Sequence, residues 1–159
     1  MSDAGGGLTH LDAAGRARMV GVGHKPPVVR RAVAEAVVRM APASARAMSD
    51  GELPKGDAAA VARVTGILAA KRTPDLIALC HPLPIDRAAV DVAVDVDAGE
   101  VRIRAEVETT ARTGVEMEAL TAVSVAALNV YDMVKGIDTG VVIDGVRLLE
   151  KTKGAPPSP

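Results

Sequence analysis

Residues 88–110 read AAVDVAVDVDAGEVRIRAEVETT, and this stretch decides the fold. On both sides of Ala98-Gly99, valine and other apolar residues alternate with aspartate, glutamate or arginine, a pattern typical of two half-buried strands joined by a tight turn. We therefore predict a β-hairpin whose apolar side chains share one face. A two-residue turn also sets the register of the two strands. The cross-strand pairs that it predicts are Val96 with Val101, Val94 with Ile103, and Asp95 with Arg102.

A helix is predicted before the hairpin, over Asp57–Lys71. Asp57 can accept hydrogen bonds from the free N–H groups of the first turn, and Lys71 suits the negative end of the helix dipole. Thr73-Pro74 then prevents continuation. Apolar residues recur at helical spacing, and we expect this stripe to face the core. The stripe consists of Val61, Val64 and Leu68.

A second, longer helix is predicted after the hairpin. Thr113 and Glu116 have the spacing of a capping box, in which each side chain accepts from the other's backbone N–H group. The helix should continue to about Lys135 and close at Gly136.

The remaining segments are less regular. Met19–Val22 is a candidate for a short strand, Ser44–Ser49 for a short helix, and Val141–Leu149 for the last strand. Val28–Met40 is ambiguous, because its alanines favour a helix while its alternation favours a strand. The outline is an antiparallel sheet with two principal helices packed on it, which is an α+β fold class.

The composition indicates one domain with an unusual core. The 159 residues suit a single domain over residues 1–159, and the Gly- and Pro-rich ends, 1–7 and 154–159, are expected to be flexible tails. The chain holds 29 Ala and 23 Val but one Tyr, no Phe and no Trp. Because small side chains remove little apolar area from water, we expect contacts between subunits to extend the core.

Charge and cysteine content narrow the function classes. A net charge of −1 argues against binding to nucleic acid or to an anionic membrane through bulk electrostatic attraction. The single Cys80 fits a reducing compartment. We find no run of about 18 apolar residues and no signal peptide, so we expect a cytoplasmic protein with no membrane partner.

Two candidate sites carry a cation or a histidine. Lys55 lies between Gly51 and Gly56 just before the first predicted helix, where free N–H groups favour an anion, although a solvated turn explains the same pattern. His81 follows Leu79-Cys80 in an apolar run. It could bind phosphate or transfer protons, or it could be a half-buried histidine bonded to backbone.

Two further candidates lie at the ends of the second helix. In Glu116-Met117-Glu118, the carboxylates could bind the N–H edge of a purine-like or pterin-like ring, or Glu116 could serve only as a cap. Asp132 and Lys135 share a helix face and could form either an acid–base couple or an ordinary surface ion pair.

Together these residues predict acid–base chemistry on an anionic, phosphorylated small molecule. The sequence has no dinucleotide fingerprint and no zinc-ligand spacing, so we expect no cofactor and no metal site.

The motifs resemble the MoaC family, the cyclic pyranopterin monophosphate synthases of molybdenum cofactor biosynthesis. The resemblance covers about residues 8–151, in the family's order. Its most specific run is Thr113–Ala122, TGVEMEALTA. The other matching runs are Leu8–His10, Lys55–Asp57, Ala69–Thr73, Leu79–Leu83, Tyr131–Met133 with Lys135, and Val146–Leu149.

This resemblance implies a ferredoxin-like core, with Val28–Met40 as a strand, and a hexamer built as a trimer of dimers with active sites at dimer interfaces. It implies a lyase reaction in which 3′,8-cyclo-7,8-dihydroguanosine triphosphate becomes cyclic pyranopterin monophosphate and pyrophosphate leaves. The alternative is a non-catalytic module that binds a nucleotide or phosphate on the same scaffold, because a fold alone does not establish an activity.

The resemblance also implies residue roles. Asp132 matches the family's catalytic aspartate, and Lys55 and Lys135 match its essential lysines. The substrate-binding positions that it implies are Leu79, Cys80, His81, Glu116, Met117 and Glu118, with Lys71, Lys151 and Lys153 as possible additional charges near the phosphates.

Overall fold

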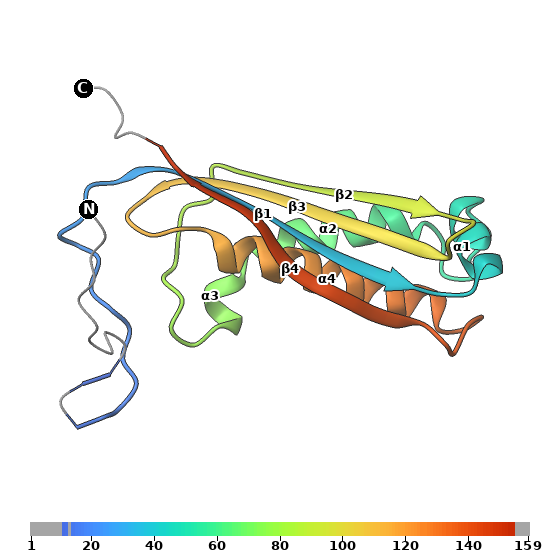
Figure 1. Ribbon diagram of the computed structural model, residues 1–159, viewed down its shortest axis with the longest axis horizontal. Coiled ribbons are helices and arrows are strands. Elements are labelled where there is room, and N and C mark those ends of the chain that lie inside the picture. Colours follow the sequence, from blue (N-terminus) through green and yellow to red (C-terminus); the bar gives the residue numbers. More distant parts are fainter. Residues whose placement is uncertain (1–10, 13, 155–159) are drawn as a thin grey trace.

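The computed structural model describes residues 11–12 and 14–154. Eight helices and strands make up the body of the molecule (Figure 1). In chain order they are β1 (Val28–Arg39), α1 (Pro42–Ser49), α2 (Ala58–Lys71), α3 (Thr73–Leu76), β2 (Arg87–Asp95), β3 (Glu100–Ala111), α4 (Glu116–Val134) and β4 (Val142–Lys153).

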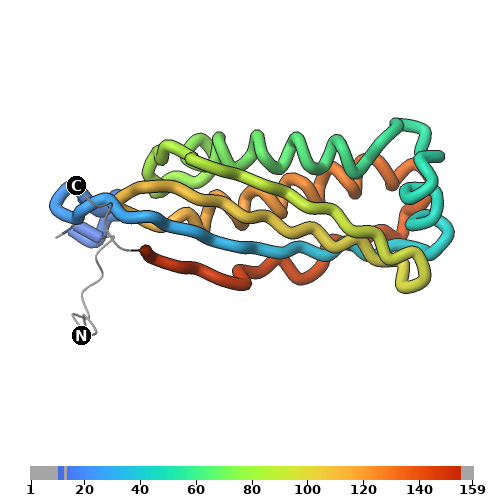
Figure 2. The backbone as a smooth tube through the Cα atoms, turned by 90° about the horizontal axis from the view of Figure 1, so that it is seen from above, coloured from blue at the N-terminus to red at the C-terminus, as the bar shows by residue number. Residues whose placement is uncertain are grey.

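The strands form one antiparallel four-stranded sheet in the order β2-β3-β1-β4. The two long helices cover one face of it, α4 against β1, β3 and β4, and α2 against β2 (Figures 1 and 2). A chain order of strand, helix, two strands, helix and strand, with β1 and β3 central, is the ferredoxin-like arrangement. The predicted α+β fold class is therefore confirmed.

Val28–Arg39 is a strand and not a helix, so the strand that the family resemblance implies for Val28–Met40 is present and ends one residue early. Residue types alternate along β1, because side chains on one face pack on α4 while the opposite face carries the charged residues. Ala32, Ala34, Ala36 and Val38 belong to the hydrophobic core. A central strand that contacts a helix closely needs such small side chains.

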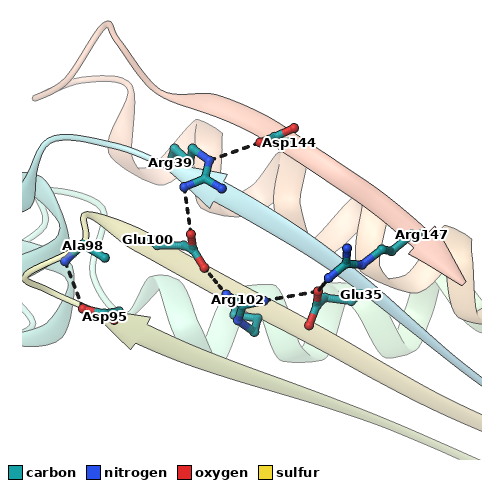
Figure 3. Close-up of polar contacts among 8 residues, drawn as sticks. All are labelled: Glu35, Arg39, Asp95, Ala98, Glu100, Arg102, Asp144 and Arg147. Atoms are coloured by element: carbon teal, nitrogen blue, oxygen red, sulfur yellow. Dashed lines mark hydrogen bonds and ion pairs between the residues drawn. The ribbon is translucent and has the colours of Figure 1, made fainter. Parts of the chain in front are cut away.

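The outer face of the sheet is covered by ion pairs between neighbouring strands (Figure 3). Glu35, only 7% exposed, accepts hydrogen bonds from Arg102 of β3 (3.3 Å) and Arg147 of β4 (2.8 Å). Arg39 bridges Glu100 (2.9 Å) and Asp144 (3.1 Å) in the same way. The charges that alternate with the apolar residues thus satisfy one another across the strands.

The predicted hairpin is present, but its predicted register is wrong by two residues. Val94 pairs with Val101, and Val92 with Ile103. The connection holds four residues instead of two, because the carboxylate of Asp95 accepts a hydrogen bond from the backbone N–H of Ala98 (3.0 Å; Figure 3). A shift of two residues keeps each side chain on its predicted face, so the sheet retains its apolar side.

Helix α2 begins as predicted, with the carboxylate of Asp57 accepting from the N–H of Ala60 (2.9 Å). The predicted buried stripe is wrong. Its residues are 36–58% exposed, and the core-facing side is instead made of alanines and Gly66. A Cβ added at Gly66 would lie 3.0 Å from the carbonyl oxygen of Ala122. Close approach of α2 to α4 therefore selects small residues for the contact.

Helix α4 has the predicted length but not the predicted cap. Val115 is the N-cap residue, no side chain caps the helix, and Glu116 is paired with Lys151 instead. By length and composition α4 is apolar enough to cross a membrane, but 56% of its apolar window is buried inside the protein. The helix is a core element, packed on the sheet and beside α2.

Three end segments differ from expectation. Met19–Val22 joins no strand; the described bridge in that region links Leu11 and Ala17. β4 continues to Lys153, four residues beyond the prediction, and α1 begins two residues early at Pro42. The predicted tail 1–7, and the part of the C-terminal tail beyond Gly154, lie outside the described residues.

Candidate functional site

Three predicted residues meet at the carboxyl end of α4. Lys55 reaches Asp132 from the loop before α2, with its Nζ 2.6 Å from Oδ2 and 2.9 Å from the backbone oxygen of Asp132. Lys135, one turn further along α4, places its Nζ 2.7 Å from Oδ1 of the same carboxylate. All three side chains are about half exposed. We call these residues the lysine–aspartate cluster.

The cluster holds Asp132 as a carboxylate. Hydrogen bonds from Lys135 and Lys55 lower the pKa of Asp132 to about 2. The carboxylate in turn raises the pKa of Lys135. At neutral pH two ammonium groups therefore share one carboxylate, leaving an excess positive charge and several N–H donors exposed to solvent. Such a cluster can bind an anion and can donate protons.

A cavity of about 480 Å³ lies at the other end of α4. The predicted segment Leu79–His81 forms one wall, and Glu116 and Met117 form another. Sequence reasoning missed the third wall. It comprises Val20, Val22 and Lys25, with Thr113 and Gly114 completing the lining. No local motif marks Val20, Val22 or Lys25; only the path of the folded chain brings them to the cavity.

His81 contacts backbone inside this wall. Its Nε2 lies 2.8 Å from the carbonyl oxygen of Val20. A carbonyl only accepts, so Nε2 must carry the hydrogen and donate it. The backbone-bonded alternative for His81 is thus present in the structure, while the ring still faces the cavity.

Glu118 lies behind the cavity wall. Its side chain is 1% exposed, and its Oε2 has no hydrogen-bond partner among the described residues. The thiol of Cys80 lies 3.7 Å from Oε1 and donates to it. Burial raises the pKa of Glu118. Burial and the neighbouring carboxyl likewise raise the pKa of Cys80 to about 11.

Glu116 has the opposite environment. Its Oε1 lies 2.6 Å from Nζ of Lys151. Burial alone would raise the pKa of Glu116. The hydrogen bonds from Lys151 and from the backbone N–H of Glu116 outweigh burial, and the pKa lies below its usual value. Beside it lies a smaller cavity of about 120 Å³ with a cationic lining. That lining includes Arg30, Arg31, Lys151 and Lys153.

The predicted site residues therefore occupy two places in one protomer. Residues 116 and 132 are sixteen apart on a continuous helix, which at the α-helical rise is about 24 Å. The two ends of α4 lie at opposite ends of the molecule (Figure 1). Lys71, at the end of α2, lines neither cavity. In the part of the chain that the structure describes, no three His, Cys, Asp or Glu side chains gather closely enough to hold a metal ion.

Comparison with known proteins places this geometry in context. The sequence model described as "MoaC family" matches residues 19–154. A cyclic pyranopterin monophosphate synthase of Roseiflexus sp. (strain RS-1) is 56% identical over 147 residues, 92% of this chain and 93% of the relative. Relatives of the same name from Nostoc sp. (51% over 157 residues; 96% and 94%) and Thermomicrobium roseum (54% over 147 residues; 92% and 89%) are similarly close.

Proposed function

The chain belongs to the MoaC family, and from that premise we propose that it is a cyclic pyranopterin monophosphate synthase. As a lyase of molybdenum cofactor biosynthesis, it converts 3′,8-cyclo-7,8-dihydroguanosine triphosphate to cyclic pyranopterin monophosphate and releases pyrophosphate. The observation that carries the proposal is the lysine–aspartate cluster, which brings the three expected catalytic residues together.

In this proposal the two lysines move the protons and Asp132 holds them in place. A carboxylate whose pKa lies near 2 is a weak base at neutral pH, whereas the ammonium groups of Lys55 and Lys135 are donors oriented by it. A substrate phosphate would attract one lysine away from Asp132 and so place it beside the reacting groups for acid–base work. The reaction requires no electron transfer, in keeping with the expectation of no cofactor.

The cavity at the other end of α4 is proposed to bind the ring system and phosphates of the substrate. Leu79, Cys80, His81 and Met117 offer one apolar and one hydrogen-bonding wall. The unpartnered Oε2 of Glu118 could accept from a ring N–H group once the thiol of Cys80 moves aside. The cationic lining around Lys151, together with Lys25, suits a triphosphate.

Because about 24 Å separates the two groups of residues, we propose that a second copy of the chain completes each site. A two-fold axis near residues 124–125, midway between Met117 and Asp132, would bring the cluster of one protomer to the cavity of its partner. Apolar side chains are exposed on the helical face, including Leu68, Leu76 and Leu128. We propose the cytoplasmic hexamer, a trimer of dimers, that the family resemblance implies.

Release of pyrophosphate from the cyclised GTP derivative tests the activity. Wild-type protein should release it, and Lys55→Ala should not, while keeping its melting temperature. Asp144→Asn, which removes an equally exposed ion pair on the outer sheet face, is the matched control and should remain active. Ligand binding without pyrophosphate release by the wild type would favour the non-catalytic module.

Mixed oligomers test the shared site. Lys55→Ala and His81→Ala each inactivate one half of it, so co-expressed chains that pair at random should regain about a quarter of the wild-type sites. Light scattering on the same samples gives the oligomeric state. A site contained in one chain would regain no activity on mixing.

A further inference from the structure

Residues 17–25 lie outside the compact body of the molecule (Figure 1). We call this segment the strap. Val20 and Val22 are half-buried, and the other strap residues are exposed, Met19 by 49%. The strap belongs to no strand, even though Met19–Val22 has a strand-like sequence. Its apolar side chains therefore have another role than pairing in the sheet.

The strap separates two cavities. The cavity of about 480 Å³ lies on one side, and one of about 370 Å³, lined also by Leu83 and Arg112, lies on the other. Val22, His81 and Thr113 line both cavities. Val22 is the strap's part of the wall that the two cavities share, so the position of the strap affects the size and access of the site.

Two hydrogen bonds connect the strap to the body within the described residues. At its base, Nε of Arg112 donates to the carbonyl oxygen of Lys25 (2.9 Å), just before the rigid Pro26-Pro27. At its middle, Nε2 of His81 donates to the carbonyl oxygen of Val20 (2.8 Å). Neither Gly21 nor Gly23 has a side chain that could add a contact on either side of Val22. The middle of the strap thus depends on one hydrogen bond and two valines.

We propose that the strap opens and closes over the cavity, and that His81 is the positioning residue that latches it through the carbonyl oxygen of Val20. The proposal rests on the proposed function for the identity of the ligand. The opening itself is measurable without turnover, so the two can fail separately.

Hydrogen exchange of the amides in residues 17–25 tests the latch, with GTP as the probe ligand. Loss of one hydrogen bond is expected to speed their exchange about 3- to 10-fold in His81→Ala. GTP should slow the exchange in the wild type by favouring the closed strap. His81→Gln retains an N–H donor near the position of Nε2, and should restore both the wild-type exchange rate and this slowing. Exchange in β1 and α4 should be unchanged in both variants, which shows that the body is folded.

Two outcomes would overturn the latch. One is wild-type exchange of the strap in His81→Ala, and the other is His81→Gln exchanging as fast as His81→Ala. Wild-type protein whose strap responds to GTP but which releases no pyrophosphate would disprove the proposed function and leave the strap intact.

A fluorescent reporter provides a second measurement. The chain has no Trp, so Met19→Trp places a single indole on the strap. Closure on GTP should shift its emission and raise its anisotropy. Asp97→Trp, in the β2–β3 turn where the side chain is fully exposed, is the matched control and should not respond. An equal response at both positions would contradict a local closure.

Discussion

The two ends of α4 hold carboxyl groups in opposite surroundings. Asp132, near the carboxyl end, is half exposed and contacts two ammonium groups, and its pKa lies near 2. Glu118, in the first turn, is buried, its partner among the described residues is a thiol and not a cation, and its pKa is raised. One helix thus presents a fixed anion at one end and a readily protonated acid at the other.

The difference shows how position on one helix sets chemical role. Asp132 is accessible, so two lysines contact it and solvent can reach all three groups. Glu118 faces the interior, where desolvation favours its neutral form. The first arrangement suits proton transfer to a bound ligand, and the second suits a buried hydrogen-bonding group of variable charge.

The largest effect is expected from a substitution in the lysine–aspartate cluster, at the charged end of α4. Asp132→Asn keeps the size of the side chain but removes the charge that orients Lys55 and Lys135. Loss of positioned acid–base groups should reduce kcat by about 100-fold or more. Because the lysine–aspartate cluster is half exposed, the melting temperature near neutral pH should fall only slightly. Pyrophosphate release and thermal unfolding, measured on the same preparation, separate the effect on activity from the effect on stability. A normal kcat would show that Asp132 has no role in the reaction.

A smaller effect is expected where α2 supports the middle of α4. Gly66→Val would force a side chain against the carbonyl oxygen of Ala122 and the methyl group of Ala126. Overpacking of this kind should lower the free energy of unfolding by about 1–3 kcal/mol. Thermal or urea unfolding measures it. Gly136→Ala, where an added Cβ meets nothing within 4 Å, is the control and should leave stability unchanged.

Local patterns in the sequence predicted the elements but not their contacts. Alternation revealed the hairpin, and the Asp57 cap located the start of α2, because both signals involve only near neighbours. The register failed because one side-chain bond from Asp95 to Ala98 lengthened the turn. The prediction that the apolar stripe of α2 is buried was wrong, because the close approach of α4 selects small residues for the buried face.

Local patterns likewise predicted one part of the candidate site and not the rest. The spacing of Asp132 and Lys135 shows that they share a helix face, but Lys55 joins them from 77 residues away. The resemblance to a family supplied that pairing; no local pattern could. The strap across the cavity, and the burial of Glu118 behind Cys80, depend on the folded path of the chain and have no signal in the sequence.

The pH dependence of stability should have opposite signs at the two ends. Because the folded pKa of Glu118 is raised above its usual 4.5, the folded state binds the proton more tightly, and stability falls as pH rises from 4.5 through the raised pKa. Asp132 has a lowered folded pKa, so its contribution is full above 3.8 and is lost as pH falls towards about 2.

Melting temperatures of Glu118→Gln and Asp132→Asn across this range measure the two contributions. Relative to wild type, Glu118→Gln should gain stability as pH rises above 4.5, and Asp132→Asn should lose its disadvantage only in strong acid. If Glu118→Gln instead followed the wild type in parallel at every pH, the carboxyl would have an ordinary pKa in the folded protein.

The smallest effect is local and concerns the thiol of Cys80. Burial and the carboxyl of Glu118 raise its pKa to about 11, and Glu118→Gln removes the charge but not the burial. The pKa in this variant should therefore fall, yet remain above the usual 9.0. Since Cys80 is the only cysteine of the chain, the rate of alkylation by iodoacetamide against pH reports this thiol alone.

A thiol that titrates near 9 in the wild type would show that Glu118 and Cys80 are not in contact in solution. The buried end of α4 would then lack the hydrogen bond that distinguishes it from the charged end.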